Sequence, residues 1–270
     1  MESIPLPTKI ELAESKKDWA KFIVEPCYPG YGTTIGNALR RVLLASLPGA
    51  AVTAVKIEGV DHEFSTVPFV KEDIVAVILN LKLLRFRLHG DETVTLALSA
   101  KGEKVVTAAD FEGPSSIEVA NGRQVIATLT DKAATLSMEI VVNPGRGYVP
   151  VESREKEKLD VGWIAIDSVY TPIKTVNFTV ENVRVGQITN YDRLLIELET
   201  DGTIKPEDAL TRSAQILVEH FSIFASLQST NEEVEAPKKK RTKAKKSETM
   251  TPATAPDAST NGAEETNATP

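Results

Sequence analysis

The sequence predicts an α+β fold in which short strands are interrupted by three helices and followed by a charged tail. Several short runs alternate apolar and polar residues, which is the period of a strand buried on one face. Three other segments repeat apolar residues at helical spacing. From residue 237 onward the chain has no aromatic residue and almost no aliphatic one. Such a segment cannot offset the entropy lost on ordering, so residues 231–270 are predicted to form a disordered tail.

The first predicted helix follows a turn that contains Pro29, Gly30 and Gly32, and its N-cap is expected at Thr33 or Thr34. On ideal helical geometry its apolar residues fall within an arc of roughly 160°. These residues are Ile35, Ala38, Leu39, Val42, Leu43 and Ala45.

The other side of this helix carries a second pattern. Asn37, Arg41 and Leu44 stand at i, i+4 and i+7, so they form one stripe along the helix. A leucine beside an arginine and an asparagine, opposite a complete apolar face, indicates a second contact surface.

Most of the predicted strands lie between the first and last helices, and Asn-Gly, Asn-Pro-Gly and Asp-Gly turn signals separate several of them. The predicted strands are Thr53–Glu58, Thr93–Leu98, Thr135–Val142, Trp163–Val169, Thr175–Glu181 and Leu194–Thr200. A second helix is predicted over Val70–Leu84, where Glu72 and Asp73 near its start complement the helix dipole.

The last predicted helix begins at Pro206, which suits the first helical position. On ideal geometry its apolar residues cover roughly 220° of the circumference, whereas packing on one sheet uses somewhat more than about 100°. They are Ala209, Leu210, Ala214, Ile216, Leu217, Val218, Phe221, Ile223, Phe224 and Leu227. The subset Leu210, Ala214, Leu217, Phe221 and Phe224 follows the 4-3-4-3 spacing of a helix pair. Two interpretations stay open, a symmetric dimer and a larger intramolecular core.

Composition excludes several classes of protein. The single cysteine, Cys27, excludes an internal disulfide framework, and the three scattered histidines have no zinc-binding spacing. The N-terminal residues lack the pattern of a signal peptide, and no apolar run is long enough to cross a membrane. We therefore expect a cytoplasmic protein with no metal site and no membrane partner.

The net charge of −7 belongs entirely to the part that is predicted to fold, because residues 231–270 contain seven acidic and seven basic residues. An acidic body is a poor candidate for a nucleic-acid-binding domain. A basic run in the tail is either a weak nucleic-acid contact or a solvated, solubilising segment. Its residues include Lys238, Lys239, Lys240, Arg241 and Lys243.

The sequence contains no recognisable catalytic, cofactor-binding or metal-binding motif, so no residue is predicted for any of these roles. The glycines from Gly30 to Gly36 have the spacing G-x-G-x-x-x-G, which is not a dinucleotide fingerprint, and no phosphate-binding lysine follows. A free-standing nucleotide-binding enzyme that uses this turn stays the alternative. The loop at residues 143–150 displays Arg146 and Tyr148 beside glycines. This loop is either a protein or phosphate contact or a structured hairpin end.

Several of these motifs, in this order, resemble the amino-terminal assembly domain of the α subunit of bacterial RNA polymerase. The likeness runs from about Lys21 to Leu227. Its carriers are the segments Glu25–Pro26, Gly30–Leu44, Leu47–Ala50, His62–Thr66, Glu72–Ile74, Leu79–Lys82, Gly145–Pro150 and Glu199–Ile204. The resemblance implies a discontinuous dimerisation subdomain, residues 1–48 and 173–230, in which two helices lie on a sheet. It also implies an inserted β-rich subdomain at residues 49–172.

The resemblance further implies a non-catalytic scaffold subunit of a nucleotidyltransferase, which forms a homodimer and recruits the β and β′ subunits. The homodimer would form through the first and last helices, at Ile35, Leu39, Val42, Leu43, Leu210, Leu217, Phe221 and Phe224. The β subunit would dock on the stripe of Asn37, Arg41 and Leu44, and the loop with Arg146 and Tyr148 would face the large subunits.

Members of this family usually continue into a helical domain that reads promoter DNA and contacts activators, whereas the sequence here ends at Pro270 in the tail. DNA is therefore expected to be reached indirectly, through the assembled enzyme.

Overall fold

The computed structural model describes residues 4–154 and 160–226. These residues form an α+β structure with three α-helices, two four-stranded antiparallel sheets and three short two-stranded ladders, so the predicted fold class is confirmed. The buried apolar residues divide into two separate hydrophobic cores that share no residue. The predicted tail and its basic run, Lys238 to Lys243, lie outside the described residues.

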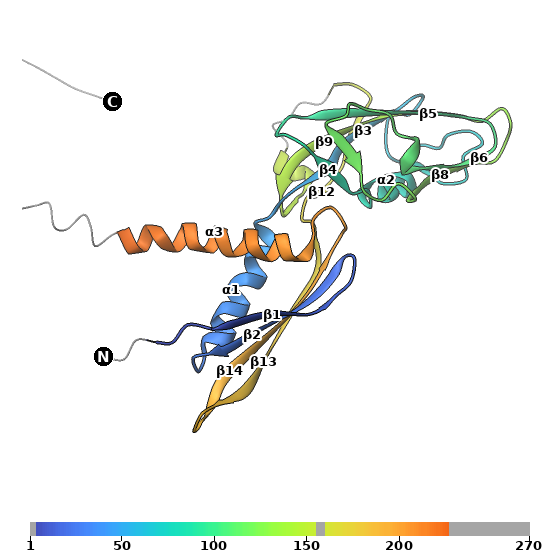
Figure 1. The fold of residues 1–270 in the computed structure, drawn as a ribbon. Helices are drawn as coiled ribbons and strands as arrows, with labels where there is room; N and C mark the ends of the chain where they lie inside the picture. The colour runs from blue at the N-terminus through green and yellow to red at the C-terminus, as the bar shows by residue number, and fades with distance from the viewer. Residues whose placement is uncertain (1–3, 155–159, 227–270) are drawn as a thin grey trace, which may run out of the picture. The chain divides into compact units, whose positions relative to one another are not determined.

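One core belongs to a sheet made from the two ends of the described chain, and we call this sheet with its two helices the platform. Its strands are β1 (Lys9–Ser15), β2 (Trp19–Cys27), β13 (Ile173–Val185) and β14 (Ile188–Thr200), in the spatial order β1-β2-β14-β13. The helices α1 (Tyr31–Ala45) and α3 (Pro206–Ser226) pack together over this sheet (Figure 1).

Alternation along the strands gives the platform sheet its two different faces. Cross-strand neighbours on the face below the helices are apolar, as in Leu194 opposite Val24 and Ile196 opposite Phe22. The other face carries ion pairs, for example Lys21 Nζ with Glu197 Oε1 at 3.0 Å. The helices therefore cover the face that the sequence makes apolar.

Helix α1 begins earlier than predicted, because a residue distant in sequence caps it. The helix starts at Tyr31, and its N-cap is Gly30 in the left-handed conformation (φ 84°), without a side-chain cap of its own. Instead, the backbone N–H groups of Gly30 and Gly32 donate to Asp192 Oδ2 at 2.9 and 3.0 Å. The expected cap at Thr33 or Thr34 is thus wrong, since a buried carboxylate from β14 satisfies the free donors of the first turn.

Gly36 of α1 lets the helix approach the sheet closely. A Cβ atom at this position would lie 2.6 Å from the ring of Phe178 on β13. The space that this glycine leaves open is therefore filled by an aromatic side chain.

The second core belongs to the inserted subdomain, which lies between α1 and β13 in the sequence. Its main sheet has the order β11-β3-β9-β5, and α2 packs against its core. The strands of this sheet are β3 (Pro48–Ile57), β5 (Val94–Lys101), β9 (Thr135–Arg146) and β11 (Trp163–Ala165). The small ladders pair β4 (Phe86–Leu88) with β7 (Ile117–Val119), β6 (Lys104–Thr107) with β8 (Val125–Leu129), and β10 (Tyr148–Val149) with β12 (Ser168–Val169). Two 3₁₀ helices span Ala108–Asp110 and Val151–Arg154.

Helix α2 (Ile74–Lys82) is shorter at both ends than the predicted Val70–Leu84. Asp73 is its N-cap and accepts a hydrogen bond from Ala76 N at 2.7 Å. Glu72 does not lie in the first turn, since its carboxylate accepts from the backbone N–H and the hydroxyl group of Thr128. The acidic pair therefore marks the start of the helix, but only Asp73 acts on it.

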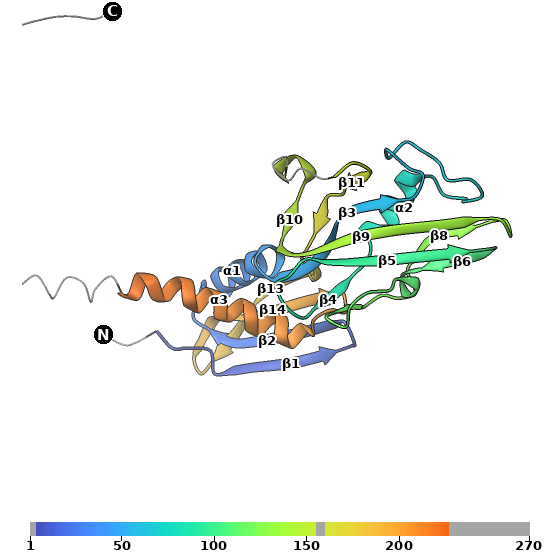
Figure 2. The same cartoon turned by 90° about the horizontal axis from the view of Figure 1, so that it is seen from above.

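Helix α3 starts at Pro206 as predicted, and only its N-terminal half is anchored to the platform. Pro206, Ala209 and Ser213 are buried. Beyond them the helix runs on past the sheet in both ribbon views (Figures 1 and 2).

Candidate functional site

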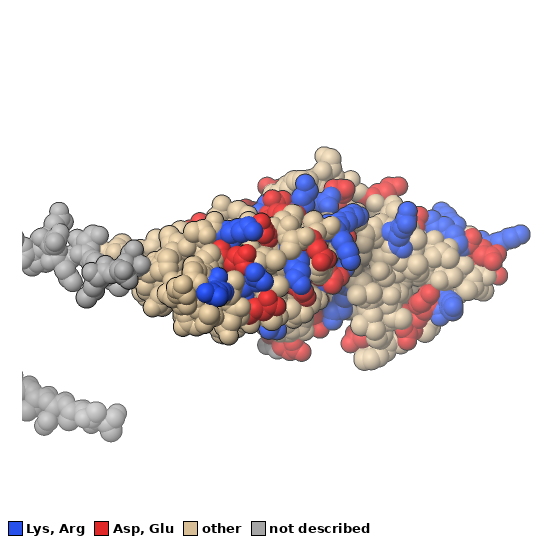
Figure 3. Space-filling view, turned by 60° about the horizontal axis from the view of Figure 1, so that its bottom comes forward, with Lys and Arg blue, Asp and Glu red and all other residues tan. Residues whose placement is uncertain are grey.

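The C-terminal half of α3 exposes large apolar side chains. Phe221 and Phe224 are 62% and 68% exposed, and Val218 and Ile223 are exposed to a similar degree. On helical geometry the two phenylalanines continue the stripe that Leu210 and Leu217 begin against the platform core. In Figure 3 this end of α3 is almost free of charged atoms, whereas positive and negative side chains intermingle over the middle of that face. The stripe that packs within the chain is therefore left uncovered where the helix outruns the sheet.

The predicted dimer residues on α1 divide into two groups. Leu39 and Leu43 are buried in the platform core of the single chain. The sheet covers this side of the helix, and the place of these two residues at a dimer interface stays a prediction. Ile35 and Val42, on the flank of the same helix, are only half-buried. The core of the single chain thus buries part of the wide apolar arc of α1 and leaves the rest of it partly exposed.

The stripe of α1 lies mostly in solvent. Asn37 and Arg41 are exposed, but Leu44 is half-buried and packs against the platform core. The helical projection placed Leu44 opposite the apolar face, whereas in the structure it lies at the edge of that face. Arg41, the charged residue of the stripe, is therefore accessible to solvent.

The loop with Arg146 and Tyr148 lies against the C-terminal end of α1. Arg146 pairs with Pro48 at the end of the β3–β9 ladder. Gly147 has φ 64° and approaches so closely that a Cβ atom on it would be 3.4 Å from Ala45 O. Arg146 and Tyr148 are both exposed. Residues a hundred positions apart in the sequence thus come together at the end of this helix.

The inserted subdomain has a groove that the sequence did not predict. It has a volume of about 480 Å³ and is lined by Val75 and Leu79 of α2, Trp163, and the ion pair of Lys82 with Asp167, among others. Val75 and Leu79 are spaced at i and i+4 and are both exposed in the structure. This spacing is visible in the sequence of α2 and indicates an apolar surface on the helix.

Comparison with known proteins places the chain in a family. Residues 55–171 match the family described as the RNA polymerase Rpb3/RpoA insert domain. The DNA-directed RNA polymerase subunit alpha of Clostridium kluyveri is 53% identical over 221 residues, which are 81% of this chain and 70% of that protein. The chain belongs to the RNA polymerase α subunit family.

Other α subunits are similar over comparable lengths. That of Roseiflexus sp. strain RS-1 is 48% identical over 235 residues, which are 87% of this chain and 72% of the relative. That of Clostridium beijerinckii is 51% identical over 228 residues, which are 84% and 72% of the two chains. The match to the insert domain falls on the inserted subdomain, which has its own core.

The turn before α1, which the alternative hypothesis treats as a nucleotide site, already holds a carboxylate. The N–H groups of Gly30 and Gly32 donate to Asp192, whose negative charge would repel a phosphate. Among the described residues no group of three or more histidine, cysteine, aspartate and glutamate side chains could hold a metal ion. Likewise, no helix in the described part of the chain has the length and apolar character to cross a membrane.

The Lys82–Asp167 pair makes the stability of the inserted subdomain depend on pH. Lys82 Nζ lies 2.9 Å from Asp167 Oδ2, and Val151 N donates to Asp167 Oδ1 at 3.0 Å. The lysine first, and then the Val151 N–H group, hold the pKa of the Asp167 carboxyl below its usual value. Because the folded pKa is lower than the unfolded value of about 3.9, the pair stabilises the fold above about pH 4. This contribution is lost as the pH falls through the folded pKa.

We therefore expect Lys82→Met to lower the melting temperature at pH 7 by about 2–4 °C, since a partly exposed pair contributes about 0.5–1 kcal/mol. The difference from the original chain should close as the pH falls below about 4. Calorimetry at a series of pH values measures it. Lys101→Met is the matched control, since Lys101 makes no ion pair among the described residues. A difference that stays constant from pH 7 to pH 3 would contradict this assignment.

Proposed function

We propose that this chain is a scaffold subunit of a cytoplasmic DNA-directed RNA polymerase, which forms a homodimer and recruits the β and β′ subunits. The observation that carries the proposal is the uncovered apolar end of α3, with Phe221 and Phe224 exposed on the continuation of its core stripe. A second copy is the occupant that we favour, because an apolar stripe can pair with the same stripe of a second copy about a two-fold axis. Leu210 and Leu217 of the same stripe are half-buried, as are Ile35 and Val42 of α1.

We further propose that the large subunits dock on the side of α1 that faces away from the platform core. This surface would include the exposed Asn37 and Arg41, the half-buried Leu44, and the adjacent loop with Arg146 and Tyr148. It would be cation-rich and partly apolar. In this proposal residues 1–48 and 173–230 form the dimerisation subdomain, 49–172 form the inserted subdomain, and the chain supplies no catalytic residue. The two separate cores support this division.

Co-expression with the β and β′ subunits of the same cell tests the proposal. We expect light scattering of the chain alone to give the mass of a dimer, and affinity purification through β to recover two copies of the chain with β′. A monomer that binds neither large subunit would overturn the proposal. Calorimetry with nucleotides, expected to give no heat, tests the alternative enzyme.

A further inference from the structure

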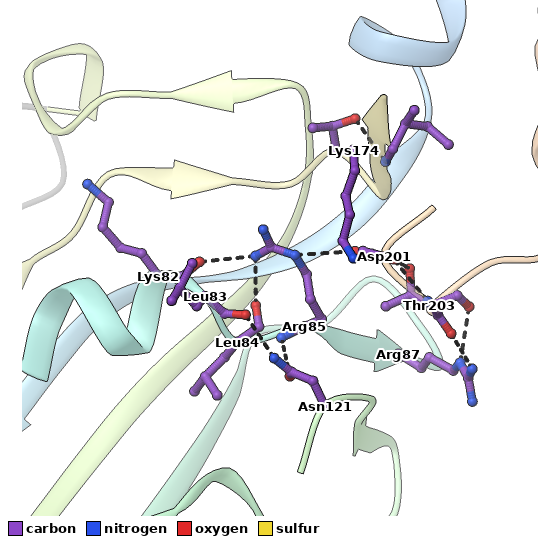
Figure 4. A network of polar contacts seen from close by, with 12 residues as sticks. Lys82, Leu83, Leu84, Arg85, Arg87, Asn121, Lys174, Asp201 and Thr203 are labelled. Carbon is purple, nitrogen blue, oxygen red and sulfur yellow. Dashed lines mark hydrogen bonds and ion pairs between the residues drawn. The ribbon is translucent and has the colours of Figure 1, made fainter. Parts of the chain in front are cut away.

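A polar cluster joins the inserted subdomain to the turn that precedes α3 (Figure 4). Arg85, which follows α2, lies with its Nε 3.4 Å from Oδ2 of Asp201 at the end of β14. The side chain of Asp201 is only 4% exposed and that of Arg85 20%. Among the ion pairs of the described residues, this one alone connects the two subdomains.

Each partner of this pair is held in place by its own subdomain. Asp201 Oδ1 accepts hydrogen bonds from the backbone N–H and the hydroxyl group of Thr203. Arg85 Nη1 donates to the carbonyl oxygens of Lys82 and Leu84 at 3.0 and 2.9 Å, at the end of α2. Both charged groups are therefore preorganised, so their contact costs little further side-chain entropy.

Arg87 adds a second contact across the same junction. Its Nε donates to Thr203 O at 3.0 Å, and its Nη2 donates to Gly202 O. Residues 201–203 lie between the end of β14 and the start of α3 at Pro206. Arg85 and Arg87 of the inserted subdomain thus both bind the turn that precedes α3.

The two subdomains have separate hydrophobic cores, so apolar packing between them is confined to the crossing segments, where the buried Tyr170 lies against Gly145. Their cores share no residue, and the chain crosses between them only at residues 47–50 and 166–173. A cavity of about 390 Å³ lies beside the polar cluster, lined by Arg87, Pro48, Pro172 and Ile204, among others. Because this part of the junction is not filled by side chains, we infer that the directional polar contacts beside it contribute to setting the angle.

We propose that Arg85, Arg87 and Asp201 form a clasp that fixes the orientation of the inserted subdomain on the platform and so lets both engage one large subunit together. The second half of this statement rests on the proposed function. A partner that touches two bodies gains from both contacts only when their geometry fits. When the clasp is open part of the time, the apparent affinity falls in proportion to the closed fraction. The three residues are positioning residues, since they lie at the junction and not in the docking surfaces.

The double variant Asp201→Asn with Arg87→Met tests the clasp. It removes the charged contacts across the junction, together with the pair of Arg87 with Glu118 inside the inserted subdomain, but leaves the bonds of Arg85 to the end of α2. The side chain of Asp201→Asn can still accept from Thr203. The matched control, Lys21→Met with Lys104→Met, removes one ion pair inside each subdomain, those with Glu197 and Asp110. Spin labels go on Thr179→Cys in the platform and Lys132→Cys in the inserted subdomain, both exposed, while the native Cys27 is buried. Labelled chain is diluted with an excess of unlabelled chain, so that most of the dimers that contain a label carry only one labelled copy.

We expect a narrow label-to-label distance distribution in the original chain and in the control, and a broad one in the double variant. With a closed fraction of about one fifth, β binding should weaken about fivefold, with the mass of the dimer unchanged. A double variant whose distribution matches the control would overturn the clasp. Broadening with unchanged β affinity would overturn its role in recruitment. An original chain that binds no β, but whose distances respond as expected, would refute the proposed function and support the clasp.

Discussion

Replacement of Phe221 and Phe224 by aspartate is expected to turn the proposed dimer into a folded monomer. Both side chains lie in solvent in the single chain, so the substitutions remove nothing from its own core. A phenylalanine side chain that becomes fully buried contributes about 1.5–3 kcal/mol, and a symmetric dimer buries the pair on both copies, so the four side chains contribute about 6–12 kcal/mol to association. The dissociation constant of the dimer should therefore rise by about 10⁴-fold or more. Light scattering over a concentration series measures this change.

The control for this experiment places the same two charges elsewhere on the same helix. Gln215→Asp with Ser222→Asp introduces aspartates roughly 100–180° away from the two phenylalanines on ideal geometry. Phe224→Asp and Ser222→Asp each place an unfavourable charge near the C-terminal end of α3, so the interaction with the helix dipole is largely matched between the two pairs. Leu217 is a poorer choice than Phe224, because it is half-buried against the platform core and its loss would weaken the fold itself. A double phenylalanine variant that still has the mass of a dimer would refute the seam.

The sequence predicted α3 well because its pattern is local. Pro206 identified the start of the helix, and the wide apolar arc indicated a face that the chain itself does not cover. The burial of the apolar residues of α1 was predicted less accurately. The projection treats every apolar residue alike, whereas the sheet buries Leu39 and Leu43 and leaves Ile35 and Val42 half-buried.

What the sequence did not reveal depends on contacts between distant residues. The cap of α1 comes from Asp192, more than 150 residues downstream, so no local N-cap pattern could identify it. The clasp likewise pairs Arg85 with Asp201, and neither residue stands in a recognisable motif for that contact. Strand β2 was not predicted because its alternation is interrupted near Pro26, yet it lies in the centre of the platform sheet. Pairing with β14 decides its structure more than its own propensity does.

Replacement of Arg41 by alanine is expected to weaken recruitment of the β subunit while the dimer stays intact. Arg41 is exposed on the side of α1 that faces away from Leu39 and Leu43, so its loss should leave the platform core and the dimer unchanged. An arginine at the centre of an interface commonly contributes about 2 kcal/mol, which corresponds to an affinity loss of about 30-fold. Titration of immobilised β with the purified dimer measures this loss.

Arg184→Ala is the matched control, because it removes the same charge from an exposed site at the β13–β14 hairpin of the platform. Among the described residues Arg184 bonds only to Gly186 O and Gln187. If long-range attraction between charges dominated, both variants would lose affinity equally and the loss would vanish at high salt. A specific contact predicts instead that Arg41→Ala alone loses affinity and dissociates faster at every salt concentration. Equal affinities for Arg41→Ala, Arg184→Ala and the original chain would remove the stripe of α1 from the docking surface and leave the loop with Arg146 and Tyr148 as its remaining candidate.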